Sequence, residues 1–530
     1  MEKSLLEVSK RFLMLLSIAV FITSCVKEEV KYEIDLSHAQ GEMSGEATQS
    51  SIILQSRLTS GNNFMQGDIA GAPGVACFEL SERLNFENSF KTQWERAIPE
   101  YDFIIKQKVN DLQPGKRYYY RLLYGPDKSK VKAGNTCTFR TLDSSETEEV
   151  DDLIDQKEFI INITSIEKKK KECTFVVVTG MHYHFFHYGY FIWSGPPYEG
   201  PDKHLGPPAL KTILSMHPDF FVGTGDNVYY DEPFEPAAQT QQELRKKYHE
   251  QFVQPRYVNL FARTPTYWEK DDHDYRFNDS DRYSDSDIHT RQYRKEKGDW
   301  GPSHELGVAT FLEQLPVVDP KDLSPVTYRT HQINRLLQIW LVEGRDYRSP
   351  NNMPDGPNKT IWGKEQKEWL KRTLLASKAT FKILISPTPM VGPDDRYKSD
   401  NHTNKTGFRF EADEFFSWLL EHGFLTKNFY IVCGDRHWQF HSIHPSGFEE
   451  FACGALVDAN SRLGRKPGDP ESTDPEAKIT QPYLQKEASG GFLRVNVTAS
   501  QSKKRPQIRF SFFDENGRLL YERVKTANNN

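Results

Sequence analysis

The stretch FVGTGDNVYYDEP (residues 221–233) carries an apolar run into a glycine, a carboxylate and two adjacent tyrosines. Gly-Asp-Asn is good turn chemistry, so an ordinary turn is one explanation. Asp226 alone does not decide between a turn and a functional site. The rest of the sequence decides, because polar groups of the same kind follow the other apolar runs.

Five apolar runs beyond residue 171 are too uniform for half-exposed strands. They are CTFVVVTG, PDFFVGTG, LLQIWLVEG, TFKILISPT and NFYIVCGD. Helical patterns separate them, as in residues 209–217, QTQQELRKKYHEQF and GKEQKEWLKRTLLAS. Near-continuous apolar strands that alternate with helices predict an α/β fold whose sheet is covered on both faces. The final runs GGFLRVNVTA, QIRFSFFDENG and LLYERVKT alternate instead, which predicts an edge hairpin of the same fold.

Residues 42–141 have an all-β pattern. Short β-branched and aromatic runs such as SIILQSRL and RYYYRLLYG lie between turn residues, which predicts an immunoglobulin- or fibronectin-like β-sandwich. The acidic LDSSETEEVDDLIDQKEF that follows predicts a linker. We therefore expect an N-terminal β-sandwich domain at 26–143, a charged linker at 144–171 and the α/β domain at 172–526, after a signal peptide at 1–25.

The first residues resemble a secretory signal. Lys3, Lys10 and Arg11 precede an apolar run that ends at Thr-Ser-Cys25, and this run is shorter than the ~18 residues of a spanning helix. Cys25 at the junction resembles the lipobox of bacterial lipoproteins, and the following KEE resembles the export tag of Bacteroidetes-type surface lipoproteins. This implies lipidation at Cys25 and a cell-envelope location on the outer membrane. A plain signal peptide is the alternative.

Charge and cysteine usage exclude other classes. The 68 basic and 74 acidic residues give a net charge of -6, so no strong field favours nucleic acid, which we do not expect as a partner. The five cysteines beyond Cys25 are scattered and show no CxxC spacing, which argues against a disulfide framework or a structural zinc site. No Gly-x-Ser-x-Gly elbow or Walker loop supports a serine hydrolase or a nucleotide switch.

Carboxylates, imidazoles and arginines collect where the apolar runs end. The groups are Asp226, Tyr229 and Tyr230; Asp271, Asp272, His273, Asp274, Asn278 and Asp279; Glu343, Arg345, Asp346 and Arg348; Asp394, Asp395, Asp400 and His402; and Asp435, His437 and His441. In layered α/β folds, reactive groups gather at strand ends. Oxygen and imidazole ligands fit Ca, Mn, Zn or Fe, and a shared carboxylate can assemble a di-metal centre. Arginines beside it can hold an oxyanion.

Three motifs resemble the metallophosphatase signature of PhoD-like alkaline phosphatases. They are Gly225-Asp226-x-x-Tyr229, Asp271-Asp272-His273-Asp274-Tyr275-x-x-Asn278-Asp279 and Gly434-Asp435-x-His437. VEGRDYR resembles that family's Asp-x-Arg-x-x-Arg strand, with Glu343 in the acidic place. The resemblance implies a layered metallophosphatase-type β-sandwich flanked by helices and preceded by the N-terminal sandwich.

The resemblance also implies roles for single residues. The implied metal ligands are Asp226, Tyr229, Asn278, Asp435, His437 and Glu343, with Asp226 as the carboxylate that bridges the two ions. The implied catalytic residues are His273, Asp272 and Arg345, and the implied substrate-binding residues are Arg345, Asn278 and Arg348. The family's first strand ends in Ser-Cys, whereas this chain has Gly180-Met181. Either a nearby histidine, His182 or His184, replaces the thiolate, or one metal site is altered or lost.

Two classes of function remain at this point. The first is hydrolysis of phosphate mono- or diesters by a metal-activated hydroxide outside the cytoplasm, with a di-metal centre of Fe, Ca, Zn or Mn. The second is a non-catalytic surface lipoprotein that binds phosphorylated or polyanionic glycans, which the missing cysteine favours. A related ester, such as a sulfate or a phospholipid head group, is a third possibility.

Overall fold

The computed structural model describes residues 35–62, 64, 67–144, 172–189, 195–233, 237–284, 301–499 and 505–528. The predicted signal peptide, Cys25 and most of the predicted linker lie outside these residues. Leu36–Asn530 forms one compact unit. Among the described helices, none combines the length and the apolar character needed to cross a membrane.

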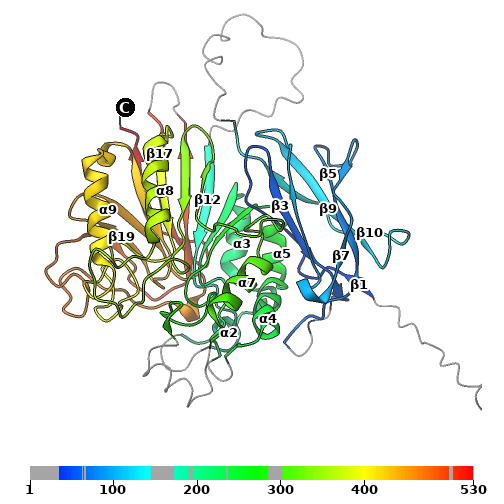
Figure 1. The fold of residues 1–530 in the computed structure, drawn as a ribbon, viewed down its shortest axis with the longest axis horizontal. Helices are drawn as coiled ribbons and strands as arrows, with labels where there is room; N and C mark the ends of the chain where they lie inside the picture. Colours follow the sequence, from blue (N-terminus) through cyan, green and yellow to red (C-terminus); the bar gives the residue numbers. More distant parts are fainter. Residues whose placement is uncertain are drawn as a thin grey trace, which may run out of the picture. The chain divides into compact units, whose positions relative to one another are not determined.

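Two large sheets pack face to face, and helices flank them (Figure 1). In spatial order, the nine-stranded sheet contains β24 (Leu519–Thr526), β23 (Gln507–Asp514), β22 (Gly491–Thr498), β12 (Glu172–Val178), β13 (Phe220–Thr224), β14 (Thr266–Glu269), β2 (Glu42–Gly45), β3 (Ile52–Arg57) and β8 (Ile104–Val109). The seven-stranded sheet contains β15 (Arg329–Gln332), β16 (Leu337–Leu341), β17 (Phe381–Ser386), β18 (Phe429–Cys433), β20 (Glu449–Cys453), β19 (Gln439–Ile443) and β21 (Thr480–Leu484). Strands β12–β13–β14 and β16–β17–β18 run parallel within their sheets.

Alternating side chains explain why both faces of each sheet are apolar. In β12, Phe175 and Val177 enter the core between the sheets, whereas Val176 and Val178 face the helices. The same alternation places Ile383 of β17 in the inner core and Leu384 against the outer helices. A strand buried on both faces reads as a continuous apolar run, so the sequence reveals the strands but not how many sheets they form.

Helices cover the outer face of each sheet. The described helices are α2 (Tyr183–Tyr188), α3 (Pro208–Ser215), α4 (Gln241–Phe252), α5 (Pro255–Phe261), α7 (His304–Gln314), α8 (Gly363–Ala376) and α9 (Arg409–Glu421). Helix α4 begins at a capping box in which Thr240 and Glu243 satisfy each other's backbone N–H groups. In α8, Gln366, Leu370 and Leu374 recur every four residues and are buried, which defines the face that packs on the sheet.

The predicted fold class is confirmed: the chain is a layered β-sandwich flanked by helices and preceded by β-strands. A smaller sheet of β10 (Lys132–Ala133), β9 (Arg117–Gly125), β5 (Gly74–Ser81), β6 (Phe90–Lys91), β7 (Glu95–Ala97) and β11 (Cys137–Arg140) forms the N-terminal sandwich with β2, β3 and β8. Because β2 also pairs with β14 through Gly45 and Thr266, the nine-stranded sheet crosses the predicted domain boundary. The boundary at residue 143 therefore stays a prediction.

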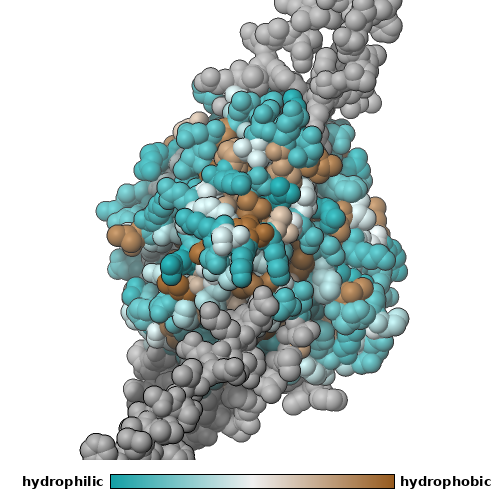
Figure 2. All heavy atoms as spheres, turned by 90° about the vertical axis from the view of Figure 1, so that its right-hand side faces the viewer, coloured by the Kyte–Doolittle hydropathy of each residue, from teal (hydrophilic) through white to brown (hydrophobic). Residues whose placement is uncertain are grey.

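The face on the side of the N-terminal sandwich is shown in Figure 2. Hydrophilic residues cover most of it, and hydrophobic residues lie among them in small groups. The exposed apolar side chains of this sandwich, such as Leu84, Phe90 and Tyr101, lie on separate segments. Single exposed apolar residues are normal on protein surfaces, so these side chains by themselves do not indicate a binding site.

Candidate metal centre

The candidate site lies where strands of both sheets end. Asp226 follows β13, residues 271–274 follow β14, and His437 follows β18. His437 Nε2 lies 3.0 Å from Asp226 Oδ2, which joins the ends of the two sheets. The strand-end groups that the sequence places far apart are therefore neighbours in the fold.

Glycines allow these two strand ends to approach each other. Gly225 has φ +88°, and a Cβ there would lie 2.4 Å from the Asp271 Cβ. A Cβ on Gly434 would lie 2.3 Å from the Thr224 hydroxyl oxygen. Asp226 (φ 54°) and Asp435 (φ 59°) themselves adopt the left-handed conformation, which aspartate tolerates better than most residues. Close packing therefore requires a glycine at positions 225 and 434, directly before each aspartate.

Asp226 is the centre of a small buried network. Its Oδ2 accepts hydrogen bonds from the Tyr229 hydroxyl and from His437 Nε2, both at 3.0 Å. The Tyr229 oxygen in turn accepts a hydrogen bond from Asn460 Nδ2 at 2.8 Å. Burial, and then the Asp226 carboxylate, raise the pKa of Tyr229 well above its ordinary value, so the phenol is a proton donor here. Three predicted ligands, Asp226, Tyr229 and His437, are therefore brought together.

Met181 occupies the position that corresponds to the family's cysteine. Met181 is fully buried in the apolar cluster beneath α2 and does not replace the thiolate as a polar group. The next residue, His182, stacks on Tyr229 with 3.7 Å between ring centroids. Its Nδ1 accepts the Phe185 N–H at 3.2 Å, and its buried Nε2 has no hydrogen-bond partner among the described residues. His182, and not the half-buried His184, is therefore the histidine beside the predicted ligands.

His273 and Asp272 lie on the other side of Asp226. His273 Nδ1 lies 2.7 Å from Asp231 Oδ1, so Asp231 fixes the ring orientation. Burial opposes protonation of His273, but Asp231, Asp272 and Asp226 outweigh it and raise the histidine's pKa well above its ordinary value. Burial would raise the pKa of Asp272, but His273 and Arg345 lower it. This arrangement keeps a cationic donor beside an ionised carboxylate.

Two groups of ligand atoms could hold cations, and both contain Asp272. One oxygen or nitrogen from each of Asp226, Asp272 and His273 lies within 4.8 Å of the others, and the same holds for Asp272, Asp279 and Asp400. The shared carboxylate is therefore Asp272, whereas the resemblance implied Asp226. Asp226 Oδ1 and Asp400 Oδ1 are buried and have no hydrogen-bond partner among the described residues. Such oxygens are costly unless a cation binds them, so this donor set fits metal ions.

Arg345 is not placed to touch a substrate. Its side chain is 0% exposed. Its Nε donates to Asp271 Oδ1 at 2.7 Å, one terminal nitrogen donates to the Ser280 carbonyl at 2.9 Å, and the other donates to Asp400 at 3.2 Å. A guanidinium bound on all sides by the protein cannot bind a phosphoryl group as well. The structure makes Arg345 a positioning residue beneath the acidic groups.

Glu343 and Arg348 also depart from their predicted roles. Glu343 accepts hydrogen bonds from Lys270 Nζ at 2.6 Å and from the Arg345 backbone N–H at 2.7 Å. It is thus a buried ion-pair partner and belongs to neither group of candidate ligands. Arg348 is buried, and its Nε donates to the Gly344 carbonyl at 2.6 Å. Desolvation, followed by repulsion from Arg345, lowers the pKa of Arg348 to about 10. The contact with Gly344 lies within the loop of Arg348 itself, so this buried side chain stabilises the loop.

Asp435 and Asn278 lie near the candidate ligands without joining them. The guanidinium of Arg436 binds Asp435 through Nε at 2.9 Å and also binds Asp394 at 2.9 Å. Burial raises the pKa of Asp435 to about 6, although Arg436 and Lys398 oppose the rise. Asn278 is exposed, and its backbone N–H donates to Asp231 at 2.9 Å. Metal binding by these two residues stays a prediction.

Some residues of the site carried no signal in the sequence. Asn460 is the last residue of a short 3-10 helix, and Lys398 and Arg462 lie in loops without periodicity. Lys398 Nζ contacts Asp279 Oδ1 within the second acidic group. Only a contact between distant loops gives these residues a role, and spacing along the chain cannot show it. Asp231, in contrast, lies in the opening stretch, two residues after Tyr229.

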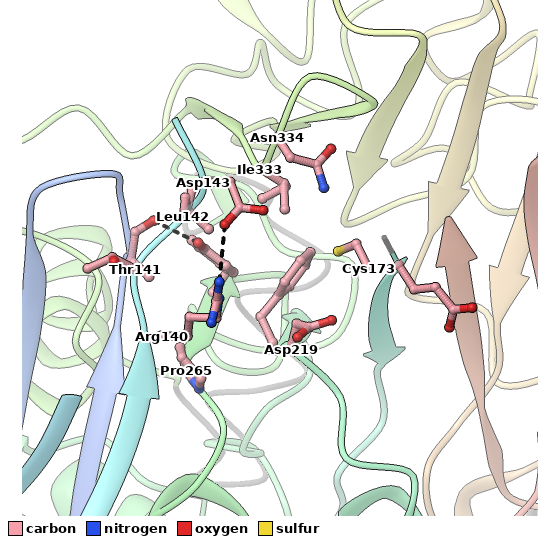
Figure 3. Close-up of a pocket in the computed structure, with 13 residues that line it drawn as sticks. Arg140, Thr141, Leu142, Asp143, Cys173, Asp219, Pro265, Ile333 and Asn334 are labelled. Carbon is pink, nitrogen blue, oxygen red and sulfur yellow. Dashed lines mark hydrogen bonds and ion pairs between the residues drawn. The ribbon is translucent and has the colours of Figure 1, made fainter. Parts of the chain in front are cut away.

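A hollow of about 40 Å³ lies at the opposite ends of the same strands (Figure 3). Cys173 and Asp219, at the amino ends of β12 and β13, line it together with Arg140 and Asp143, whose side chains approach to 3.5 Å. A buried water needs ~10–15 Å³ by this measure, so the hollow holds a few waters and not an organic ligand. The strand ends with Asp226 and Asp272, and not this hollow, form the candidate site.

Two family profiles match the chain. The profile described as PhoD-like phosphatase matches residues 191–505, and the profile of the N-terminal domain of PhoD-like phosphatases matches residues 25–142. The first match alone spans more than half of the 530 residues. No curated protein matches the chain.

Two solved structures share the fold. One, described as PhoD, has a TM-score of 0.67 at 17% sequence identity and covers 93% of this chain and 90% of its own. A purple acid phosphatase from seeds of yellow lupin (Lupinus luteus) has a TM-score of 0.54 at 11% identity, with coverage of 92% and 74%. At these identities the likeness establishes the fold alone.

Proposed function

This chain belongs to the PhoD-like phosphatase family, and on that premise we propose that it hydrolyses phosphate mono- or diesters outside the cytoplasm at a di-metal centre. Family membership makes the protein a hydrolase, and metal-dependent phosphoesterase activity fits its donor set. The observation that carries the proposal is the pair of buried carboxylates Asp226 and Asp272, with Tyr229 and His437 bound to Asp226. The protonated His273 lies within 4.8 Å of both carboxylates and serves as the proton donor instead of a metal ligand. Without a cation this concentration of buried acidic groups would have no function to offset its cost.

The chain's own residues supply the remaining parts of the reaction. Asp226 and Asp272 would hold the metal ion, and iron, zinc, manganese and calcium all suit carboxylate, imidazole and phenol donors. A bound ion would supply the positive charge that lowers the pKa of a water and stabilises the phosphoryl oxygens. Asp231 holds His273 through Nδ1, which leaves Nε2 to give a proton to the leaving oxygen. We expect Asn278, which is exposed beside Asp231, to contact the substrate.

The test is a panel of aryl phosphate mono- and diesters, with a sulfate ester and a phospholipid head group included. The mature chain is stripped with a chelator and reloaded separately with iron, zinc, manganese or calcium. We expect the stripped protein to be inactive and at least one metal to restore turnover. A folded protein without turnover under any metal would leave the glycan-binding lipoprotein as the better hypothesis. Metal analysis of the native protein identifies the ions.

Arg462, and not Arg345 or Arg348, supplies the exposed guanidinium at this site. Its side chain is 38% exposed, and its backbone N–H donates to the His437 carbonyl at 3.0 Å. Asp395 binds the Arg462 guanidinium at 3.0 Å. The central carbon of this guanidinium lies 4.7 Å from the centre of the Trp438 ring. These contacts hold a charged, bidentate donor in one orientation while leaving it open to solvent. Such a donor suits a phosphoryl oxygen.

We expect Arg462→Ala to raise KM for a phosphate ester by about 10- to 100-fold, since a charged hydrogen bond contributes about 1.5–3 kcal/mol. Because the contact is made to the substrate in its ground state, kcat should change less. Arg465→Ala is the matched control, because Arg465 binds the same Asp395 and is 31% exposed. Equal kinetic effects in both variants would assign the role to Asp395 or to general surface charge.

The location outside the cytoplasm is supported by the basic and apolar residues before Cys25. We expect the native protein to partition into detergent and Cys25→Ala to stay in the aqueous phase or remain uncleaved. Identical partitioning of the two proteins would rule out a lipid anchor at Cys25.

A further inference from the structure

The second acidic group already contains a cation that belongs to the protein. Asp272, Asp279 and Asp400 each place an oxygen within 4.8 Å of the other two, and the ammonium of Lys398 contacts Asp279 Oδ1. Asp400 Oδ1 is buried and remains without a hydrogen-bond partner among the described residues. The ammonium therefore binds one carboxylate of the group and leaves another unsatisfied.

The other cation beneath this group cannot leave. Arg345 is fully buried and is fixed by Asp271, Asp400 and the Ser280 carbonyl. Lys398, in contrast, carries its charge on a flexible four-carbon stem, and Asp279 is the partner that its ammonium contacts. Of the two cations, Lys398 is the one that can move away when another ion enters.

The backbone on both sides of this ion pair is held independently of it. The Asp279 N–H donates to Asp272 Oδ2 at 2.6 Å, and the Asp279 carbonyl accepts from Asn351 Nδ2 at 2.7 Å. The Lys398 N–H donates to the Asp395 carbonyl at 3.1 Å, and its carbonyl accepts from Asn404 at 2.6 Å. The lysine side chain can therefore swing out while the three carboxylates keep their positions.

We propose that Lys398 is a tethered cation that competes with a metal ion for the position formed by Asp272, Asp279 and Asp400. This inference rests on the proposed function, since it treats that position as the second metal site of the same centre. An incoming divalent ion must displace the ammonium before it can use all three carboxylates. Within the part of the chain that the structure describes, Asp226 at the first position contacts Tyr229 and His437 and no lysine, so this position fills without the competition. The centre therefore holds one metal ion tightly and a second one weakly and exchangeably.

The test is a calorimetric titration of the chelator-stripped mature chain with Mn²⁺ alone. Metal analysis after dialysis then measures how much Mn²⁺ stays bound. We expect two classes of site in the parent. In Lys398→Met, the second dissociation constant should fall by about 10- to 100-fold, because the competing unit charge is gone, while the first changes little. Lys398→Arg, which keeps a charge, should retain the weak second site. Lys398→Gln serves if the methionine variant does not fold.

Lys382→Met is the matched control. Lys382 is as buried as Lys398 but lies on β17, where its ammonium donates to the Ala379 carbonyl at 2.5 Å. The Lys382→Met substitution should leave both Mn²⁺ dissociation constants unchanged. Equal affinity of the two sites in the parent, or a second site that Lys398→Met and Lys398→Gln do not tighten, would overturn the proposal. Absence of ester hydrolysis would instead defeat the proposed function and leave the Mn²⁺ titration readable.

Discussion

Asp226→Asn is expected to lower kcat/KM by on the order of 1,000-fold, with loss of bound metal, because the substitution removes the charge from the central ligand. Asparagine keeps the shape of the side chain and can still accept the hydrogen bonds that Tyr229 and His437 donate to Asp226 at 3.0 Å. The fold should therefore persist while the chemistry fails. The measurements are kcat/KM for the best ester of the panel, metal content and a circular dichroism spectrum.

The same substitution should not destabilise the metal-free protein. Asp226 is fully buried, and desolvation together with Asp272, Asp271 and Asp274 raises its pKa well above its ordinary value, although His273 opposes the rise. A carboxyl whose pKa is raised on folding destabilises the folded protein at neutral pH, because the same carboxyl ionises more easily in the unfolded chain. A neutral amide has no such cost. With chelator present, Asp226→Asn should be at least as stable as the parent to urea. Stability exchanged for function in this way is typical of active sites.

Asp219→Asn is the control for this variant. Asp219 precedes the same strand at its opposite end, where its Oδ2 accepts the Thr174 N–H at 2.8 Å. There the change should cost about 1 kcal/mol of stability and leave kcat/KM unchanged. If Asp226→Asn keeps full activity and full metal content, Asp226 is a turn residue and the assignment of the centre is wrong.

Local rules were sufficient to predict the strands and the polar groups at their ends. Runs such as residues 220–224 are apolar on both faces because both faces are covered, and the glycine after each run marks a close approach. Asp226, Tyr229 and His437 could be predicted as candidates because each lies within a few residues of the end of such a run. The contact of Asp226 with Tyr229 is local, whereas its contact with His437 joins the ends of two sheets and could not be predicted from the runs.

Whether each arginine side chain is buried or exposed could not be predicted in the same way. Arg345 lies at a strand end like the ligands, but its partners Asp271 and Asp400 come from loops far along the chain. Because these carboxylates bind its guanidinium, Arg345 is a buried positioning residue and not the substrate-binding residue that its motif implies. Arg462 shows the reverse, since nothing in its own segment indicates that it meets His437. Pairing between loops, and not local pattern, decides which charges face solvent.

Arg345→Met is expected to reduce the free energy of unfolding by about 3–5 kcal/mol, the usual cost of removing one partner of a buried ion pair. Its guanidinium touches Asp271 and Asp400 and donates to the Ser280 carbonyl, and each of these groups would lose that hydrogen bond. Urea unfolding followed by tryptophan fluorescence, with chelator present, measures the loss. Added Mn²⁺ should recover part of it, because a cation can replace the missing charge among the carboxylates.

Arg348→Met separates this effect from the loss of any buried arginine. Arg348 lies three residues further along and is equally buried, but it donates to the Gly344 carbonyl and to Asn351 instead of to carboxylates. Its removal should cost about 1–2 kcal/mol and should respond little to Mn²⁺. For the folded Arg345→Met protein reloaded with metal, KM should stay within a few-fold of the parent, because the side chain is 0% exposed and cannot reach a substrate. A variant of normal stability whose KM rises steeply would return Arg345 to the substrate-binding role that its motif implies.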